Sequence, residues 1–170
     1  GLAALYVKNY PEATQLLSES LRMRERKLKE AQAKVVDAAF FLGLSLYEQG
    51  KYRESVDAYR KAADLREDDS TILNNLGLSL HEAGNYAEAE PLYQRGLAIY
   101  EKALGPDHPD TAASLNNLAL LYKSQGKYDE AEPLYQQALA IDEKALGPDH
   151  PSTATSLNNL AGLYHVQGKY

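Results

Sequence analysis

Apolar residues recur along most of this chain at intervals of three and four positions, the spacing that places them on one face of an α-helix. The clearest example covers residues 111–125, whose apolar positions are Leu115, Leu118, Ala119 and Tyr122. Gly126 follows at once, and glycine readily adopts the positive φ found at the end of a helix. The pattern therefore predicts an amphipathic helix over this segment.

A second amphipathic pattern begins near Tyr128. Its apolar positions are Ala131, Leu134, Tyr135, Ala138, Leu139 and Ile141. Gly147 and Pro148 end it, and Pro133 falls about one turn into the predicted helix, where a missing backbone N–H costs little. Two such helices joined by a short turn predict an antiparallel helical hairpin.

The same hairpin pattern recurs in tandem. Residues 73–112 and 115–154 are identical at 28 of 40 positions when the sequence is shifted by 42 residues. The strings GPDHPDTA and GPDHPSTA mark the joints between units. Self-similarity at this period predicts supersecondary units that stack on one another and share a continuous core.

The recurring positions resemble the tetratricopeptide repeat, in which Leu, Gly and Tyr positions on a first helix (helix A) face Ala and aromatic positions on a second (helix B). In one unit these are Leu115, Leu118, Ala119 and Tyr122 on helix A, with Ala131, Tyr135 and Ala138 on helix B. Two earlier units match at Leu73, Leu76, Gly77, Leu80, Gly84, Ala89, Tyr93 and Gly96, and at Ala39, Leu42, Gly43, Leu46, Gly50, Ser55, Tyr59 and Ala62. The 42-residue units, with their LNNLA, EAEPLY, EKALG and PDHP strings, resemble the kinesin light chain subclass of that family.

The resemblance implies an all-α fold, a right-handed superhelical solenoid of antiparallel helix pairs with about nine helices. It covers nearly the whole chain as a single array. We expect a partial repeat at 1–33, full repeats at 34–69, 70–109 and 110–151, and helix A of a truncated repeat at 152–170. An array cut within a unit leaves an apolar face without its neighbour, so end-to-end self-association is a second expectation.

The segment 28–35 leaves two alternatives open. It contains no Gly or Pro, and apolar positions continue through it at helical spacing, so a single helix over 11–48 fits. Tyr10 and Tyr52 are nevertheless 42 residues apart, which keeps the phase of the array. We therefore expect a reversal near residues 30–34, whereas an unbroken helix there would favour a domain-swapped dimer.

Charge and composition narrow the classes of function. The 170 residues carry a net charge of -6 at pH 7, and all of this excess lies in residues 70–170. Nucleic acid is therefore not an expected partner, because phosphates are bound by clustered Lys and Arg. No apolar run approaches the roughly 18 residues of a membrane-spanning helix, so we expect no membrane partner and a cytoplasmic location. The absence of Cys removes thiolate metal sites and cysteine nucleophiles.

Residues that could carry chemistry do not form a catalytic or metal-binding set. His81 lacks a second His four residues later, the spacing of a zinc-protease helix. His108 and His150 each follow an Asp, but one His and one Asp per joint cannot complete a zinc site. We expect these two histidines to cap the helices that open at Pro109 and Pro151. The sequence thus predicts neither catalysis nor a bound metal or cofactor.

The remaining candidate surface is the face of helix A that points away from the predicted core. The resemblance implies that the A helices line a concave groove. A ladder of amides and the residues further along each helix occupy that face: Asn74, Asn75, Asn116, Asn117, Asn158, Asn159, Leu78, His81, Leu120, Lys123, Gly162 and His165. Because an amide both donates and accepts, the ladder can pair with the backbone of an extended peptide; alternatively, part of it joins adjacent helices. Asn75, Asn117 and Asn159 are the favoured ligand-facing members.

The unit before this ladder presents apolar residues instead, namely Phe40, Phe41, Leu44 and Tyr47. If they are exposed in the groove, they form an apolar anchor pocket for a partner. The alternative is that the long preceding helix covers them.

The expected function is a non-catalytic interaction scaffold that binds a peptide segment of a protein partner in the concave groove. Family grooves that clamp a terminal carboxylate use Lys and Arg, where this chain has Asp37, Thr71, Ala113 and Thr155. Lys123 is the one fixed groove cation in the sequence, so a neutral or basic segment suits the groove as well as an acidic one. The alternative is a structural spacer or self-assembling arm of a larger multidomain protein, which makes contacts through its open ends.

Overall fold

The computed structural model describes residues 10–169, and this part of the chain is helical apart from short joints. The helices are α2 (Tyr10–Glu48), α3 (Tyr52–Leu65), α4 (Ser70–Glu82), α5 (Tyr86–Leu104), α6 (Pro109–Ser124), α7 (Tyr128–Leu146) and α8 (Pro151–Gln167). The all-α prediction is confirmed, but the expected count of about nine helices is wrong, because the described residues form seven. The start of the expected partial repeat, residues 1–9, lies outside the described residues.

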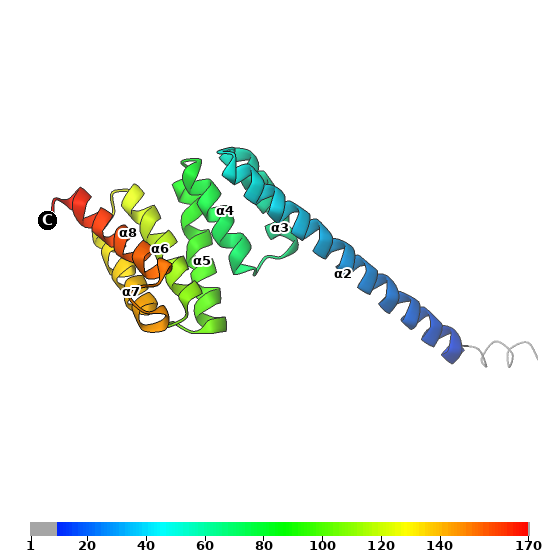
Figure 1. Cartoon of the computed structure of the whole chain (residues 1–170). Helices are drawn as coiled ribbons and strands as arrows, with labels where there is room; N and C mark the ends of the chain where they lie inside the picture. The colour runs from blue at the N-terminus through cyan, green and yellow to red at the C-terminus, as the bar shows by residue number, and fades with distance from the viewer. Residues whose placement is uncertain (1–9, 170) are drawn as a thin grey trace, which may run out of the picture.

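The helices pack as antiparallel pairs that stack in a row (Figure 1). α2 packs on α3, α4 on α5 and α6 on α7, and the second helix of each pair also packs on the first helix of the next. Close backbone contacts also join α2 to α4, α4 to α6 and α6 to α8. Within residues 10–169 no close backbone contact joins α3, α5 and α7 to one another, although the side chains of Arg60 on α3 and Glu88 on α5 form an ion pair. The first helices therefore form the inner face of the stack, and α3, α5 and α7 form its outer face.

Helix α2 is unbroken throughout its length, so the expected reversal near residues 30–34 is wrong. The reason is local. α5 and α7 end at Gly105 and Gly147, whose φ angles of 94° and 89° favour glycine. At the same place in the repeat, residues 29–33 read Lys-Glu-Ala-Gln-Ala, which are good helix formers. Helix propensity thus overrides the phase of the array, and the first part of α2 projects from the stack (Figure 1).

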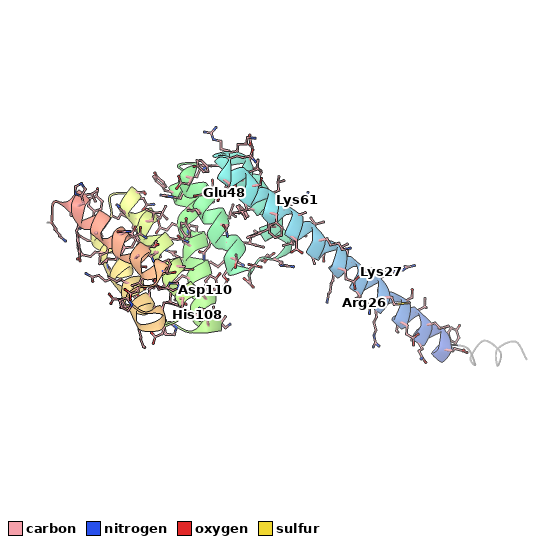
Figure 2. The ribbon with its side chains drawn as sticks, viewed as in Figure 1. Arg26, Lys27, Glu48, Lys61, His108 and Asp110 are labelled. Atoms are coloured by element: carbon pink, nitrogen blue, oxygen red, sulfur yellow. The ribbon has the colours of Figure 1, made fainter. Side chains whose placement is uncertain are left out.

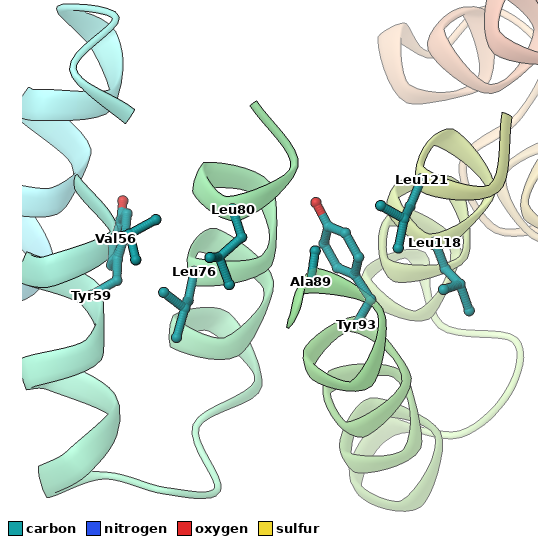
Figure 3. Packing of buried hydrophobic residues seen from close by; sticks show 8 residues of the cluster. All are labelled: Val56, Tyr59, Leu76, Leu80, Ala89, Tyr93, Leu118 and Leu121. Carbon is teal, nitrogen blue, oxygen red and sulfur yellow. The ribbon is translucent and has the colours of Figure 1, made fainter. Parts of the chain in front are cut away.

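The core consists of apolar layers between successive helices, and each outer helix contributes one fully buried tyrosine. These are Tyr59, Tyr93 and Tyr135. Tyr93 belongs to the same apolar cluster as Leu118 and Leu121 of the next inner helix (Figure 3). On its other side the ring lies against Gly77, where a Cβ would come within 2.9 Å of the Tyr93 ring. The small residues of the repeat pattern therefore permit the close approach of each helix pair.

Polar side chains cap the N-termini of three inner helices. The Nδ1 atom of His108 accepts a hydrogen bond of 3.1 Å from the backbone N–H of Asp110, at the start of α6 (Figure 2). His150 Nδ1 accepts in the same way from Ser152, also at 3.1 Å. The predicted capping role of both histidines is confirmed. Asp69 caps α4 through its carboxylate, which accepts from two backbone N–H groups.

Candidate functional site

The inner helices present equivalent residues at three positions along one face. These positions hold Phe41, Leu44 and Tyr47 on α2, Asn75, Leu78 and His81 on α4, Asn117, Leu120 and Lys123 on α6, and Asn159, Gly162 and His165 on α8. Because each inner helix contacts the next, equivalent residues follow one another across the stack. The residues at these three positions therefore follow one another along the inner face of the stack.

Two members of the amide ladder join adjacent inner helices. Asn74 Nδ2 donates to Ser114 Oγ at 2.7 Å, and Asn116 Nδ2 donates to Ser156 Oγ at 2.6 Å. Each bond links residues 40 positions apart, one helix to the next inner helix. Asn74 also lies against Gly96 of α5, so its amide fills the space between helices. The alternative in which part of the ladder bonds between helices therefore applies to this pair.

The other members differ in what engages them. Asn75 Nδ2 donates to the backbone oxygen of Thr71 at 2.8 Å, within its own helix. Asn159 Nδ2 makes only a 3.4 Å contact with Asn116 Oδ1. The side chain of Asn117 has no hydrogen-bond partner within residues 10–169, and the same holds for the exposed Asn158. Asn117, Asn158 and Asn159 therefore retain the most hydrogen-bonding capacity for a ligand, and of these Asn117 and Asn159 also line a hollow.

These two amides line a hollow of about 210 Å³ between α6 and α8. Its lining residues are Pro109, Ala113, Asn116, Asn117, Asp142, Ser152, Thr155 and Asn159. The hollow is rich in side-chain donors and acceptors and carries one charge, that of Asp142. Such a surface can recognise a peptide backbone by hydrogen bonding and can receive a cationic or neutral donor.

Asp142 is the residue that the pattern of the sequence did not single out. It lies on the outer helix α7, is 2% exposed, and accepts a 2.6 Å hydrogen bond from Ser156 Oγ. Ser156 in turn accepts from Asn116, so the carboxylate, the hydroxyl and the amide form one chain. The sequence held one indication of Asp142: an acidic residue directly follows the apolar position Ile141, whereas the equivalent residue of α5 is Tyr100.

A second hollow, of about 230 Å³, lies between α2 and α4. Its lining residues are Val36, Asp37, Phe40, Phe41, Arg66, Asp69, Thr71 and Ile72. Phe40 is half-buried, and its ring meets Tyr59 edge-on at a centroid distance of 5.5 Å. Phe41 is 65% exposed. The projecting part of α2 does not cover these rings, so Phe41 is available as an apolar contact while Phe40 mainly supports the core.

The residues at the third position differ from one inner helix to the next. His81 is nearly buried, with Nε2 2.8 Å from Ser124 Oγ, so it joins α4 to α6. Lys123 is half-buried, and its Nζ lies 3.1 Å from the point where a Cβ on Gly162 would stand. The missing side chain at Gly162 therefore makes room for the lysine. His165 is exposed near the end of α8.

The apolar candidates on this face are only partly accessible. Leu78 and Leu120 are half-buried, and Leu44 is exposed. Tyr47 packs against Tyr52 with ring centroids 5.3 Å apart, and burial raises the pKa of its hydroxyl. These residues flank the polar ladder rather than forming a separate pocket.

Residues 10–169 show neither a metal-binding cluster nor a membrane-spanning helix. Residues 10–169 contain no group of three or more His, Cys, Asp or Glu side chains that could hold a metal ion. None of the described helices combines the length and apolar character needed to cross a bilayer.

Comparison with known proteins identifies the repeat. Residues 68–144 and 115–170 match the family model described as tetratricopeptide repeat, and residues 43–84 match a second model, described as TPR repeat. No curated protein matches the sequence.

Solved structures of kinesin light chain-like proteins have the same fold. The Podosopora anserina protein with nearly identical TPR-like repeats is 26% identical, with a TM-score of 0.71 over 79% of this chain and 67% of the other. BtubC (BKLC) from P. vanneervenii is 22% identical, with a TM-score of 0.69 over 94% of this chain and 66% of the other. The chain thus spans about two thirds of the length of these relatives.

The first TPR of Spaghetti (RPAP3), solved with the HSP90 peptide SRMEEVD, is also similar. It is 17% identical, with a TM-score of 0.62 over 79% of this chain and 94% of the other. This similarity, like that to BtubC, establishes the fold.

Proposed function

Because the chain belongs to the tetratricopeptide repeat family, we propose that it is a non-catalytic interaction scaffold whose inner face binds a peptide segment of a protein partner. The Spaghetti domain, which shares the fold, holds a peptide in its solved structure. The right-handed winding predicted from the resemblance is part of this proposal, since it curves the inner helices around the bound segment.

One observation carries the proposal: the hollow between α6 and α8 presents the amides of Asn117 and Asn159 beside the carboxylate of Asp142. Each amide can donate to a peptide carbonyl and accept from a peptide N–H. Asn117 gives up no protein hydrogen bond when it binds a ligand, and Asn159 gives up only a 3.4 Å contact. Recognition of an extended backbone therefore costs little within the protein.

The charge of the hollow favours a neutral or basic segment over an acidic one. Asp142 is the charged lining residue, and an acidic side chain beside it would meet like-charge repulsion in a partly desolvated site. A Lys or Arg of the partner would instead form a charge-assisted hydrogen bond with that carboxylate. At the α2 end of the same face, the exposed ring of Phe41 supplies an apolar anchor for the segment.

The test uses a positional-scanning peptide library on the immobilised chain, followed by fluorescence anisotropy with a selected peptide. The Asn117→Ala, Asn159→Ala double variant should bind that peptide about tenfold or more weakly, because about two hydrogen bonds are lost. Asp142→Asn should abolish the preference for Lys or Arg at one peptide position. Asn can still accept a hydrogen bond from Ser156, so the fold should be retained.

Gln137→Ala is the matched control, because it removes an exposed amide from the outer helix α7 and should leave affinity unchanged. Circular dichroism verifies that each variant keeps its helices. Equal binding by the parent chain and the folded double variant would place recognition elsewhere and refute the proposal, as would a library from which no peptide is selected.

A further inference from the structure

The projecting part of α2 carries large apolar side chains that are mostly exposed in the described chain. Leu17 is 71% exposed, and Leu21 and Leu28 are exposed to a similar degree. The polar side chains of this segment, including Arg26 and Lys27, spread from the same helix (Figure 2). An isolated helix with such a stripe leaves apolar area in water that packing against a partner would remove.

A cleft of about 370 Å³ lies at the base of this projection, between α2 and α3. Its lining residues are Lys34, Val35, Ala38, Ala39, Leu42, Ala58 and Lys61. Leu42 is 55% exposed there. The lining is apolar between two lysine stems, which suits an apolar helix face.

Comparison of equivalent positions shows what normally fills this cleft. The residues equivalent to Leu42 are Leu76, Leu118 and Leu160, which are 4%, 5% and 8% exposed. Leu160 packs in one cluster with Tyr135 of the preceding outer helix, and no described helix follows α8. This position is therefore covered by the outer helix that precedes it, and at Leu42 that helix is missing.

The projecting part of α2 has the sequence register of the missing outer helix. Tyr10 lies 42 residues before Tyr52, the first residue of α3. The same shift places Leu17 on Tyr59. Leu17 thus occupies the position that would contact Leu42. On one continuous helix, however, their separation of 25 positions holds them about 37 Å apart at 1.5 Å per residue.

The exposed stripe on α2 is self-complementary. The residues of the stripe are spaced alternately four and three positions apart. They are Leu17, Leu21, Arg24, Leu28, Ala31, Val35, Ala38 and Leu42. All eight are exposed, and seven are apolar. This spacing is typical of two long helices packed side by side. When two copies of the stripe lie antiparallel about a two-fold axis, Leu17 of one copy faces Leu42 of the other, and Leu28 faces Ala31. The spacing is the same in both directions, as such a pair requires.

We propose that two copies of this chain exchange the projecting parts of their α2 helices. The first part of α2 from each copy lies in the cleft between α2 and α3 of the other, with Leu17 against Leu42 across a two-fold axis near residues 29–30. Each copy thereby receives the outer helix that its stack lacks. The interface is separate from the amide ladder, so the proposal does not rest on peptide binding.

The first test measures the mass of the chain by light scattering and sedimentation across a range of concentrations. The parent should be a dimer, and Leu17→Asp and Leu42→Asp should each weaken it by about a hundredfold or more, because each change occurs twice in the interface. Leu157→Asp, which alters an exposed leucine of α8, is the matched control and should leave the dimer unchanged.

A second test distinguishes exchange from folding back within one copy. The chain has no native Cys, so a Leu17→Cys, Leu42→Cys variant should oxidise to a covalent dimer on a non-reducing gel. Replacing residues 29–33 by the chain's own joint, with Lys29→Gly, Glu30→Pro, Ala31→Asp, Gln32→His and Ala33→Pro, should convert it to an internally cross-linked monomer.

Three results would overturn the proposal. The parent chain could be monomeric at all concentrations, or the cysteine pair in the unaltered joint could cross-link within one copy. A dimer that survives both Leu17→Asp and Leu42→Asp with its mass unchanged would show that another surface joins the copies.

Discussion

At the scale of single residues, the buried tyrosines of the outer helices contribute through their rings. The hydroxyls of Tyr59, Tyr93 and Tyr135 are buried and have no hydrogen-bond partner in the described part of the chain. Tyr93→Phe should therefore leave the free energy of unfolding unchanged or raise it by up to about 1 kcal/mol, whereas Tyr93→Ala should lower it by about 3–5 kcal/mol. Urea unfolding followed by circular dichroism measures both. A clear loss of stability in Tyr93→Phe would contradict the absence of a partner.

Because these hydroxyls are buried, the free energy of unfolding should fall at alkaline pH. Desolvation raises the pKa of Tyr59 and of Tyr135 from about 10 to about 12. The folded state therefore holds these protons more tightly than the unfolded state, so the stabilising effect is complete below pH 10 and is lost as pH rises toward 12. Unfolding titrations between pH 9 and 12 should show a decline that is shallower in the Tyr59→Phe, Tyr135→Phe variant. An equal decline in both proteins would exclude these hydroxyls as its source.

The predictability of single residues from sequence depended on how local their environment is. Tyr59 and Gly77 followed from the repeat pattern, because the contact of Tyr59 with Gly43 and that of Gly77 with Tyr93 each lie within one helix pair. The bond from Asn74 to Ser114 depends on the distance between stacked inner helices, which no single-helix pattern contains. Asp142 was missed for the same reason, since its partner Ser156 lies on the next inner helix.

At the scale of helices, the joints between units are fixed by short polar caps. His108→Ala should cost about 1 kcal/mol, because the N–H of Asp110 loses its acceptor at the start of α6. His108→Asn supplies an alternative side-chain acceptor and should recover most of this loss. Thermal and urea unfolding of the three proteins measure the difference. A His108→Asn variant as unstable as His108→Ala would mean that the imidazole contributes through packing instead.

Helix α2 shows where sequence-level prediction of elements failed. The repeat phase favoured a reversal near residues 30–34, but the phase is a property of the array, while a helix ends only where a local residue ends it. Gly147 and Pro148 perform that function after α7, and residues 29–33 contain neither. Gly84, Gly105, Gly126 and Gly147 each follow a helix at the place that the repeat pattern gives them, whereas residues 66–69, between α3 and α4, contain neither Gly nor Pro.

At the scale of the whole molecule, each helix contacts only its near neighbours, so stability should be lost regionally. Leu121 on α6 and Leu163 on α8 occupy equivalent repeat positions and are both fully buried. Leu163→Ala should speed amide hydrogen exchange in α7 and α8 while leaving α4 protected. Leu121→Ala should speed it in α5, α6 and α7, because the cavity lies at the middle of the stack.

Hydrogen exchange read by mass spectrometry resolves these regions, and Leu104→Ala, at an exposed leucine, is the control for the loss of a side chain alone. If Leu163→Ala accelerated exchange equally from α4 to α8, the stack would unfold as one cooperative unit. Coupling between neighbours would then exceed the stability of individual pairs.

If the stack instead unfolds region by region, the hollow between α6 and α8 can loosen while α4 stays folded. Peptide binding there should therefore slow exchange in α6, α7 and α8 more than in α4.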